Sequence, residues 1–231
     1  MTRAVAVLAM AALAFLPLPA DASELDLRIG AFFPRADSSL FDDNRELYGF
    51  GVDAFLEKSD WIGVYGGAEW RFRVAPSLWM GLHVDGYGRS LHTEYLDFER
   101  PSGAPIEQSL KLSIVPLGAT IRWVPRDGRR DISPYLGGGI DAVFYKYEEI
   151  GDFIDFFDDE LPVVEDHFVD DGAALGFHVL AGLRVPVSDD ISLSGEARYL
   201  WARTDMGDDF GPDLEIDLSG LSATFGVSIR F

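Results

Sequence analysis

The chain has 231 residues, no cysteine and a formal net charge of −20 at neutral pH. Without thiols it can form no disulfide, thiol nucleophile or thiolate metal site, and so acidic a surface repels nucleic acid and anionic lipid. The composition therefore excludes a nucleic-acid-binding role.

The first 22 residues have the pattern of a secretory signal peptide. Met1-Thr2-Arg3 is a short basic start, a proline-containing apolar run follows, and Ala20-Asp21-Ala22 has small residues at the two positions that a signal peptidase reads. A membrane-spanning helix fits less well, because the run is short, broken by proline and has no basic flank on its far side. We expect residues 1–22 to be a signal peptide and residues 23–231 to form one domain.

From residue 25 onward, apolar and polar residues alternate with a period of two, as in half-buried β-strands. In the first segment Leu25, Leu27 and Ile29 alternate with Asp26 and Arg28. Seven more segments follow this pattern, and the expected strands are 25–33, 61–74, 78–88, 117–124, 134–147, 176–185, 191–201 and 221–231. Since no segment has a convincing amphipathic helical pattern, we expect an all-β fold.

The expected connections alternate in length. Strands two and three, four and five, and six and seven are joined by short turns, and the other connections are longer. An even number of strands, with short turns at one end and long loops at the other, is typical of a bacterial outer-membrane barrel with periplasmic turns. Both termini would then lie in the periplasm.

Two features interrupt the regular pattern. The apolar residues change side near Val115-Pro116 and near Gly220, and we interpret these changes as bulges or bends. The stretch LYGFGVDAF alternates more weakly, and is either part of a long loop or an extension of a strand.

Alternation alone does not decide which face is buried, because a soluble barrel or a two-sheet sandwich would hide the apolar face instead. Three observations favour a membrane: the signal-peptide pattern, aromatic residues at strand ends, and an apolar alternation that continues to Phe231. The aromatic residues expected at the membrane interfaces are Trp61, Trp79, Trp123, Tyr199 and Trp201.

Four segments carry a resemblance to a known family: VPLGATIRWV, ISPYLGGGIDAVFYKY, GFHVLAGLRVPVSDDISLSGEARYLWA and DLSGLSATFGVSIRF. They resemble the outer-membrane β-barrel family of small porin-like proteins, the OmpA, OmpX and OmpW types. The resemblance implies an eight-stranded antiparallel up-and-down transmembrane β-barrel, surrounded by lipid and lipopolysaccharide in the outer membrane of a Gram-negative bacterium. It also implies that the ending looks like the signal read by the barrel-assembly machinery, here Phe225, Val227, Ile229 and Phe231.

An eight-stranded barrel has a lumen that side chains can just fill. The polar face would direct charges of both signs into this lumen, which suggests a network of ion pairs. The members expected are Glu69, Arg71, Arg73, Asp85, Arg122, Asp141, Arg184, Glu196 and Arg198. We expect a plugged lumen and a structural or surface-interaction role. The alternative is a narrow channel for ions or small molecules that opens when arginine partners exchange.

The segment YEEIGDFIDFFDDELPVVEDHFVDD has eleven acids between Glu148 and Asp171. We expect a solvated acidic loop outside the cell. Its carboxylates suit Ca²⁺ or Mg²⁺, alone or bridging to lipopolysaccharide phosphates, although the spacing fits no EF-hand. Weak candidates for metal ligands are Asp155, Asp158, Asp159 and Glu160, and no cofactor is predicted.

A lipid-A-modifying enzyme is a weaker alternative, because some barrels of this kind hydrolyse acyl chains with a Ser-His-acid set. The only comparable run is Ser90-x-His92-x-Glu94, in which serine and histidine stand in reverse order. A rim of ordinary polar residues explains this run more simply, so we predict no catalytic activity. We also expect a monomer, since eight strands close their sheet without a partner.

Overall fold

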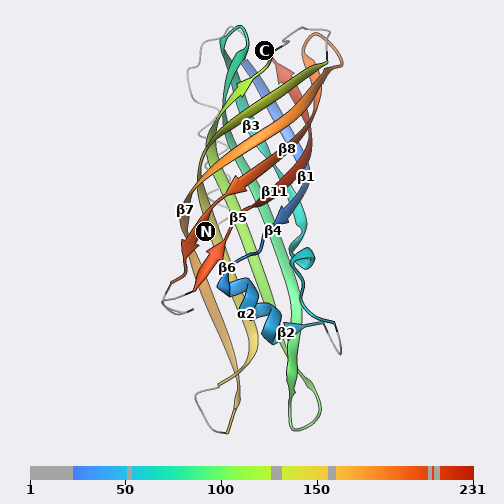
Figure 1. The fold of residues 1–231 in the computed structure, drawn as a ribbon. Coiled ribbons are helices and arrows are strands. Elements are labelled where there is room, and N and C mark those ends of the chain that lie inside the picture. The colour runs from blue at the N-terminus through green and yellow to red at the C-terminus, as the bar shows by residue number, and fades with distance from the viewer. Residues whose placement is uncertain (1–22, 51–53, 126–131, 156–159, 208–209, 211–213) are drawn as a thin grey trace.

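The computed structural model describes residues 23–50, 54–125, 132–155, 160–207, 210 and 214–231. The expected signal peptide, residues 1–22, lies outside these described residues. Within them, eight antiparallel strands form a closed ring in which chain neighbours pair and the last strand pairs with the first (Figure 1). The strands of the ring are β1 (Ser23–Pro34), β3 (Gly63–Ala75), β4 (Leu78–Glu99), β5 (Pro105–Trp123), β6 (Ser133–Ile154), β7 (Val163–Pro186), β8 (Ile191–Trp201) and β11 (Gly220–Arg230). The all-β, eight-stranded up-and-down barrel is therefore confirmed.

The two ends of the barrel differ. At one end, which we call the turn end, the residues 76–77 and 187–190 make short connections. The Phe231 backbone N–H there donates to the Ser23 carbonyl at 3.1 Å, so the last residue lies beside the first strand. The opposite end, which we call the loop end, carries the longer connections and the only described α-helix (Figure 1).

The connections at the loop end contain short elements of their own. These are α2 (Ser39–Leu47), β2 (Tyr48–Gly49), the 3₁₀-helix η1 (Lys58–Trp61), β9 (Arg203–Asp205) and β10 (Glu215–Asp217). The sequence did not indicate α2, because nine residues are too few for a clear helical period. The helix nevertheless buries Leu40, Phe41 and Asn44 on one side. Of the weak stretch LYGFGVDAF, Tyr48-Gly49 pairs with β4, and residues 51–53 lie outside the description.

None of the described helices combines the length and the apolar character that crossing a membrane would need.

The apolar face of the strands points outward. Leu27 and Ile29 are 51% and 65% exposed, whereas their polar neighbours in the strand, Asp26 and Arg28, are buried. The same holds around the ring, where Val64, Leu175 and Phe225 are among the most exposed large side chains. A soluble barrel or a sandwich would show the opposite pattern, so both alternatives are excluded. We call this outward apolar surface the belt.

We interpreted the change at Val115-Pro116 as a bulge or a bend, and a bulge is wrong. The β5–β6 register runs without a shift from Gln108 to Trp123. What changes is the face that is apolar: nearer the turn end, Leu117 and Ile121 point outward, and nearer the loop end, Leu112 and Ile114 are buried inside. The strand is regular, but it leaves the belt and enters a part of the barrel with an ordinary apolar core.

The change at Gly220 has a related cause. Register is continuous along β11 from Gly220 onward, so no bulge lies there either. Leu218, just before the strand, is buried in the core at the loop end, and Leu221, just after its start, is exposed on the belt.

Most of the expected acidic loop is also strand. β6 and β7 remain paired from Ser133 and Arg184 up to Ile154 and Val163, so the segment forms the end of a long hairpin. Two of the expected interface aromatics are wrong as well, since Trp61 and Trp79 are buried inside the barrel. Trp123 is 53% exposed, and Trp201 stacks against Phe177 on the outer surface with ring centroids 5.1 Å apart.

Candidate functional site

The lumen is filled with charged groups toward the turn end. Arg28 donates to Asp85 through two nitrogens, Nε at 2.8 Å and Nη2 at 2.6 Å, and its Nη1 donates to Glu69 at 2.9 Å. A planar guanidinium is well suited to such a fork because its donors are fixed in one plane. Arg28 therefore joins strands β1, β3 and β4 across the lumen.

Two further arginines complete this group. Arg122 donates to Glu69 at 2.7 Å and to Glu196 at 2.8 Å. Arg198 donates to Asp85 at 3.2 Å and to Glu196 at 3.1 Å. The six side chains are between 0 and 6% exposed, and their positive and negative charges are equal in number. Mutual compensation of this kind is what allows charges to be buried. We call Arg28, Glu69, Asp85, Arg122, Glu196 and Arg198 the lumen network.

A second charged cluster lies at the turn end. Glu24 accepts from Arg184 at 3.0 Å and from Arg230 at 2.5 Å. Asp26 accepts from Arg71 at 2.9 Å and from the Ser228 hydroxyl at 2.6 Å. These contacts connect the first strand with the last and hold the seam of the ring from inside.

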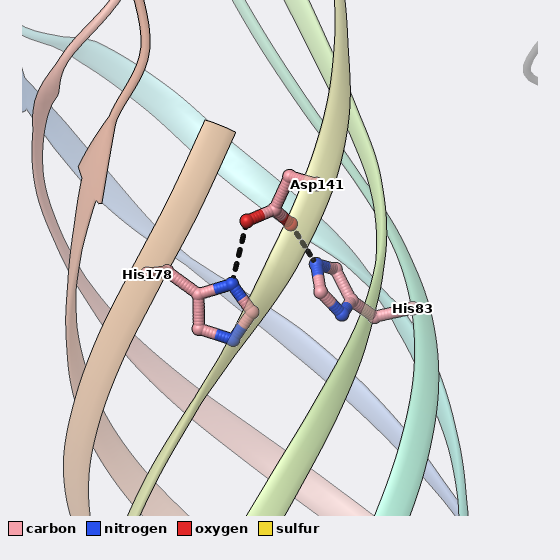
Figure 2. A group of neighbouring side chains, drawn as sticks. All are labelled: His83, Asp141 and His178. Carbon is pink, nitrogen blue, oxygen red and sulfur yellow. Dashed lines mark hydrogen bonds and ion pairs between the residues drawn. The ribbon is translucent and has the colours of Figure 1, made fainter. Parts of the chain in front are cut away.

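A closed ring of hydrogen bonds lies beside the lumen network. The Asp141 carboxylate contacts His83 Nε2 at 2.9 Å and His178 Nδ1 at 2.6 Å (Figure 2). The Thr120 hydroxyl contacts the remaining nitrogens, His83 Nδ1 at 3.3 Å and His178 Nε2 at 3.1 Å. A hydroxyl can donate one hydrogen bond and accept another, so Thr120 can contact both imidazoles at once.

Two glycines make room for this ring. A Cβ atom at Gly118 would lie 2.3 Å from Asp141 Oδ1 and 2.7 Å from His83 Cε1. At Gly139 it would lie 2.8 Å from His178 Cε1. Both positions face the lumen, and side chains there would displace the imidazoles.

His83, Asp141 and His178 form the only described set of three ligand-type residues whose donor atoms lie within 4.8 Å of one another. Two imidazoles and a carboxylate can bind transition metals. Here, however, the nitrogens that face Asp141 already use its carboxylate in short hydrogen bonds, and the side chains are at most 1% exposed. The geometry is that of a complete protein network, and a metal would have to break it.

Apolar side chains pack together inside the barrel at the loop end. Phe41 of α2 packs edge-on against Trp61 with ring centroids 5.4 Å apart, and Trp61 lies 6.4 Å from Tyr147 of β6. Asn44 Nδ2 donates to the Tyr147 hydroxyl at 2.7 Å. We call residues 35–50 and 54–62, with the inner residues they cover, the plug. Its fully buried large side chains include Leu40, Phe41, Leu56, Trp61, Leu110, Leu112, Ile114 and Tyr147.

Glu149 is a buried acid of the plug, and no described residue forms an ion pair with it. Glu149 accepts from the Tyr147 hydroxyl at 2.6 Å and lies 3.5 Å from the Tyr48 hydroxyl. It lies beyond Phe144, the last large apolar side chain that β6 exposes on the belt before its loop end. Burial raises the pKa of Glu149 to about 7, although the hydrogen bonds with the Tyr147 and Tyr48 hydroxyls act to lower it. Burial and the nearby Glu149 likewise raise the pKa of Tyr147.

The expected network is distributed over three places. Glu69, Asp85, Arg122, Glu196 and Arg198 meet in the lumen network, Arg71 and Arg184 belong to the cluster at the turn end, and Asp141 is in the histidine ring. Arg73 is exposed at the turn end, where Nη2 donates to the Pro76 carbonyl at 2.5 Å, so its expected place in the lumen is wrong. Five further polar residues lie inside, where the same alternation places them, but were not among the expected members: Glu24, Asp26, Arg28, His83 and His178.

The other candidates are not brought together. Asp158 and Asp159 lie outside the described residues, and Asp155 and Glu160 flank the tip of the β6–β7 hairpin. Ser90, His92 and Glu94 share the face of β4 opposite Leu91, with no hydrogen bond among them in the described chain. The terminal residues Phe225, Val227, Ile229 and Phe231 are exposed and lie on or next to the belt face of β11.

Comparison with known proteins agrees with this geometry. The model of the outer membrane protein beta-barrel domain family matches residues 4–231. OprG, an outer-membrane protein of Pseudomonas aeruginosa, is 10% identical, with 90% of this chain and 95% of that chain covered and a TM-score of 0.54. Neisserial surface protein A is 16% identical over 91% and 97% of the two chains, with a TM-score of 0.48. A search of curated proteins finds no match.

Proposed function

The chain belongs to the outer membrane protein beta-barrel domain family, and from this premise we propose that it is a closed barrel with a structural or surface-interaction role. One observation carries the proposal: the six charged side chains of the lumen network contact one another and are at most 6% exposed. The plug supports it, because Trp61 and Tyr147 close the loop end with apolar groups. A conducting pore needs a continuous polar path, which a packed apolar layer opposes.

The orientation follows from the family. The protein lies in the outer membrane of a Gram-negative bacterium, with lipid and lipopolysaccharide around the belt. Short turns are periplasmic in such barrels, so the loop end faces the exterior. Exposed acids there include Glu107, Glu165, Asp166 and Asp171. They give the outer surface a negative charge that favours cations, including divalent ions bridging to lipopolysaccharide phosphates.

Assembly and oligomeric state belong to the same proposal. The outward residues of β11 that end in Phe231 fit a signal for the barrel-assembly machinery. Within the belt each described strand of the ring pairs on both sides, which supports a monomer.

Conductance across a planar bilayer tests the closed lumen. We expect the refolded chain to be silent, while its gel mobility without heating differs from that of the boiled sample and so reports a folded barrel. Discrete and reproducible current steps from the folded protein would favour the narrow channel instead.

Substitution of Arg122 distinguishes a structural network from a gate. Arg122→Met leaves Glu69 and Glu196 without one of their cations, and removing one partner of a buried pair costs about 3–5 kcal/mol. We expect a lower free energy of unfolding in urea and no conductance. Arg73→Met is the matched control, because it removes the same charge from an exposed site and should change stability little. A stable Arg122→Met barrel that conducts would contradict the closed-lumen proposal.

A further inference from the structure

A small cavity lies inside the barrel at the turn end, next to the lumen network. Its volume is about 10 Å³, which is room for one water molecule or one small ion. Arginines from three strands border it: Arg71 of β3, Arg122 of β5 and Arg184 of β7. The other lining residues are Glu24, Trp79, Val124 and Tyr135. We call it the turn-end cavity.

Two of these arginines have a donor that no described residue satisfies. Arg71 and Arg122 are 4% and 2% exposed, and the Nε atom of each is buried without a hydrogen-bond partner. Their terminal nitrogens are used elsewhere, since Nη2 of Arg71 donates to Asp26 at 2.9 Å and Nη2 of Arg122 donates to Glu69 at 2.7 Å. A buried N–H without an acceptor is costly, and more so on a charged group. An acceptor in the cavity that both side chains border would supply the missing partner.

The charges of the cluster at the turn end do not balance. Arg71, Arg184 and Arg230 face only two carboxylates, those of Glu24 and Asp26. The lumen network next to this cluster is balanced in itself. One positive charge is therefore in excess at this end of the lumen, and an opposite charge nearby stabilises a buried ion. The excess favours an anion over a neutral water as the missing acceptor.

The acids of the described chain do not fill this role. Glu24 is the only acid among the described residues that border the cavity, and it already accepts from Arg184 at 3.0 Å and from Arg230 at 2.5 Å. Asp141 lies farther along the lumen, where the two histidines of its ring hold its carboxylate. The anion has to come from solution.

The walls of the cavity limit the size of the anion. Its apolar part is formed by Trp79, Val124 and Tyr135, which belong to one buried cluster. The Arg184 guanidinium lies 5.8 Å from the centre of the Trp79 ring, and that of Arg122 lies 5.5 Å from the centre of the Tyr135 ring. These cation–π contacts hold the aromatic walls in place. Phosphate, sulfate and carboxylates have several heavy atoms and exceed the room for one, whereas a halide is a single atom that accepts hydrogen bonds.

We propose that the turn-end cavity binds one halide ion, with the Nε atoms of Arg71 and Arg122 as its donors. The ion neutralises the excess charge of the cluster and completes the hydrogen bonds of two buried guanidinium groups. Chloride is the halide used in the stability test. The proposal goes beyond the closed lumen and is independent of it, because ion binding and conductance are measured separately.

Crystals of the refolded native chain grown in sodium bromide test the site directly. Bromide gives an anomalous X-ray signal and water does not. We expect one anomalous peak in the turn-end cavity, within hydrogen-bonding distance of the Nε atoms of Arg71 and Arg122. Electron density there without an anomalous signal would identify a water and overturn the proposal.

Stability in chloride provides a second readout. The urea midpoint is measured in detergent micelles at constant ionic strength, with sodium gluconate replaced stepwise by sodium chloride. We expect the midpoint to rise with the logarithm of the chloride concentration above the dissociation constant, because an ion that binds only the folded chain stabilises it. Arg71→Lys keeps a positive charge beside Asp26 but removes Nε, and should reduce this rise by at least half.

Arg198→Lys is the matched control. The Nε atom of Arg198 is also buried without a partner, but Arg198 does not border the cavity, so the rise with chloride should persist. Equal midpoints of the native chain in chloride and gluconate would overturn the proposal, as would an unchanged rise in Arg71→Lys or a lost rise in Arg198→Lys. A bromide peak without any effect of chloride on the midpoint would show an adventitious ion only, and would overturn it too. The diffraction experiment needs no variant, so it decides the proposal even where a substitution prevents folding.

Discussion

At the scale of single residues, Glu149 is a buried acid whose protonation changes near neutral pH. It faces Tyr147 on its own strand and Tyr48 on β2, with Tyr95 of β4 next to Tyr48 at a centroid distance of 5.1 Å. No Lys, Arg or His of the described chain forms an ion pair with it. Its hydrogen bonds link the plug to the barrel wall, since Asn44 of α2 donates to Tyr147.

The pH dependence of the plug follows from this. The pKa of Glu149 rises from 4.5 to about 7 on folding, so folding favours the protonated acid. The stability gained is fully present below pH 4.5 and is lost as pH rises through 7, by about 3 kcal/mol in all. We expect protease cleavage within residues 35–62 to increase in the native chain when the pH is raised from 5 to 8. The cleavage of Glu149→Gln, measured at each pH, is the reference for this increase.

The neighbouring Glu148 provides the control for this measurement. A hydrogen bond from Lys146 lowers the pKa of Glu148, so Glu148→Gln should leave the dependence between pH 5 and pH 8 unchanged. If the native chain and Glu149→Gln were cleaved alike at both pH values, Glu149 would not control the plug.

Glycines that face the lumen should be intolerant of a methyl group. At Gly118 a Cβ atom would meet Asp141 Oδ1 at 2.3 Å and the Ile140 carbonyl oxygen at 2.6 Å. Gly118→Ala should therefore lower the free energy of unfolding in urea by about 1–3 kcal/mol. Gly195 lies on the outward face of β8, where a Cβ atom would meet nothing within 4 Å, so Gly195→Ala should have little effect. Equal stabilities of the two variants would show that the histidine ring is not tightly packed.

At the scale of elements, β5 shows how one regular strand serves two environments. Its outward residues Ile121 and Trp123 are more than half exposed on the belt, and its inward residues Leu110 and Leu112 are fully buried in the plug. In lipid, apolar side chains are favoured on the outer face of the barrel. In water they are favoured in its interior, so the apolar face changes where the strand leaves the membrane. The backbone needs no bulge to achieve this.

Lysine substitutions on the two faces of β5 should fail in different ways. Ile121→Lys places a charge on the belt, at a cost that depends on depth and reaches at most about 2–4 kcal/mol at the bilayer midplane, and should reduce folding into liposomes as read by gel mobility. Ile114→Lys places it in the plug, and should allow insertion but expose residues 35–62 to protease. Ser113→Lys, next to it and facing outward, should do neither. Normal insertion of Ile121→Lys would show that the belt is not in lipid.

At the scale of the whole molecule, the barrel combines two kinds of interior. The half nearer the turn end has apolar residues outside and compensated charges inside, whereas the half nearer the loop end has an apolar core and acidic residues outside. The plug belongs to the half nearer the loop end, where Trp61 from the first connection lies against Tyr147 of β6. This arrangement accounts for a net charge of −20 on a membrane protein: acids are displayed outside the belt or paired within the lumen.

The sequence by itself determined the barrel, its strand number, its outer-membrane location and the face of each strand within the belt. A period of two separates the two faces of a strand, because neighbouring side chains point to opposite sides. The signal-peptide pattern, the aromatic residues at strand ends and the apolar ending then favoured lipid on the apolar face. The sequence could not show which charges meet, since Arg28 and Asp85 are 57 positions apart and the stagger of the ring decides their contact. Nor could it reveal α2, whose stability comes from burying Leu40 and Phe41 rather than from its own short helix. Only the tertiary structure determined these features, because they depend on contacts across the lumen that no local pattern records.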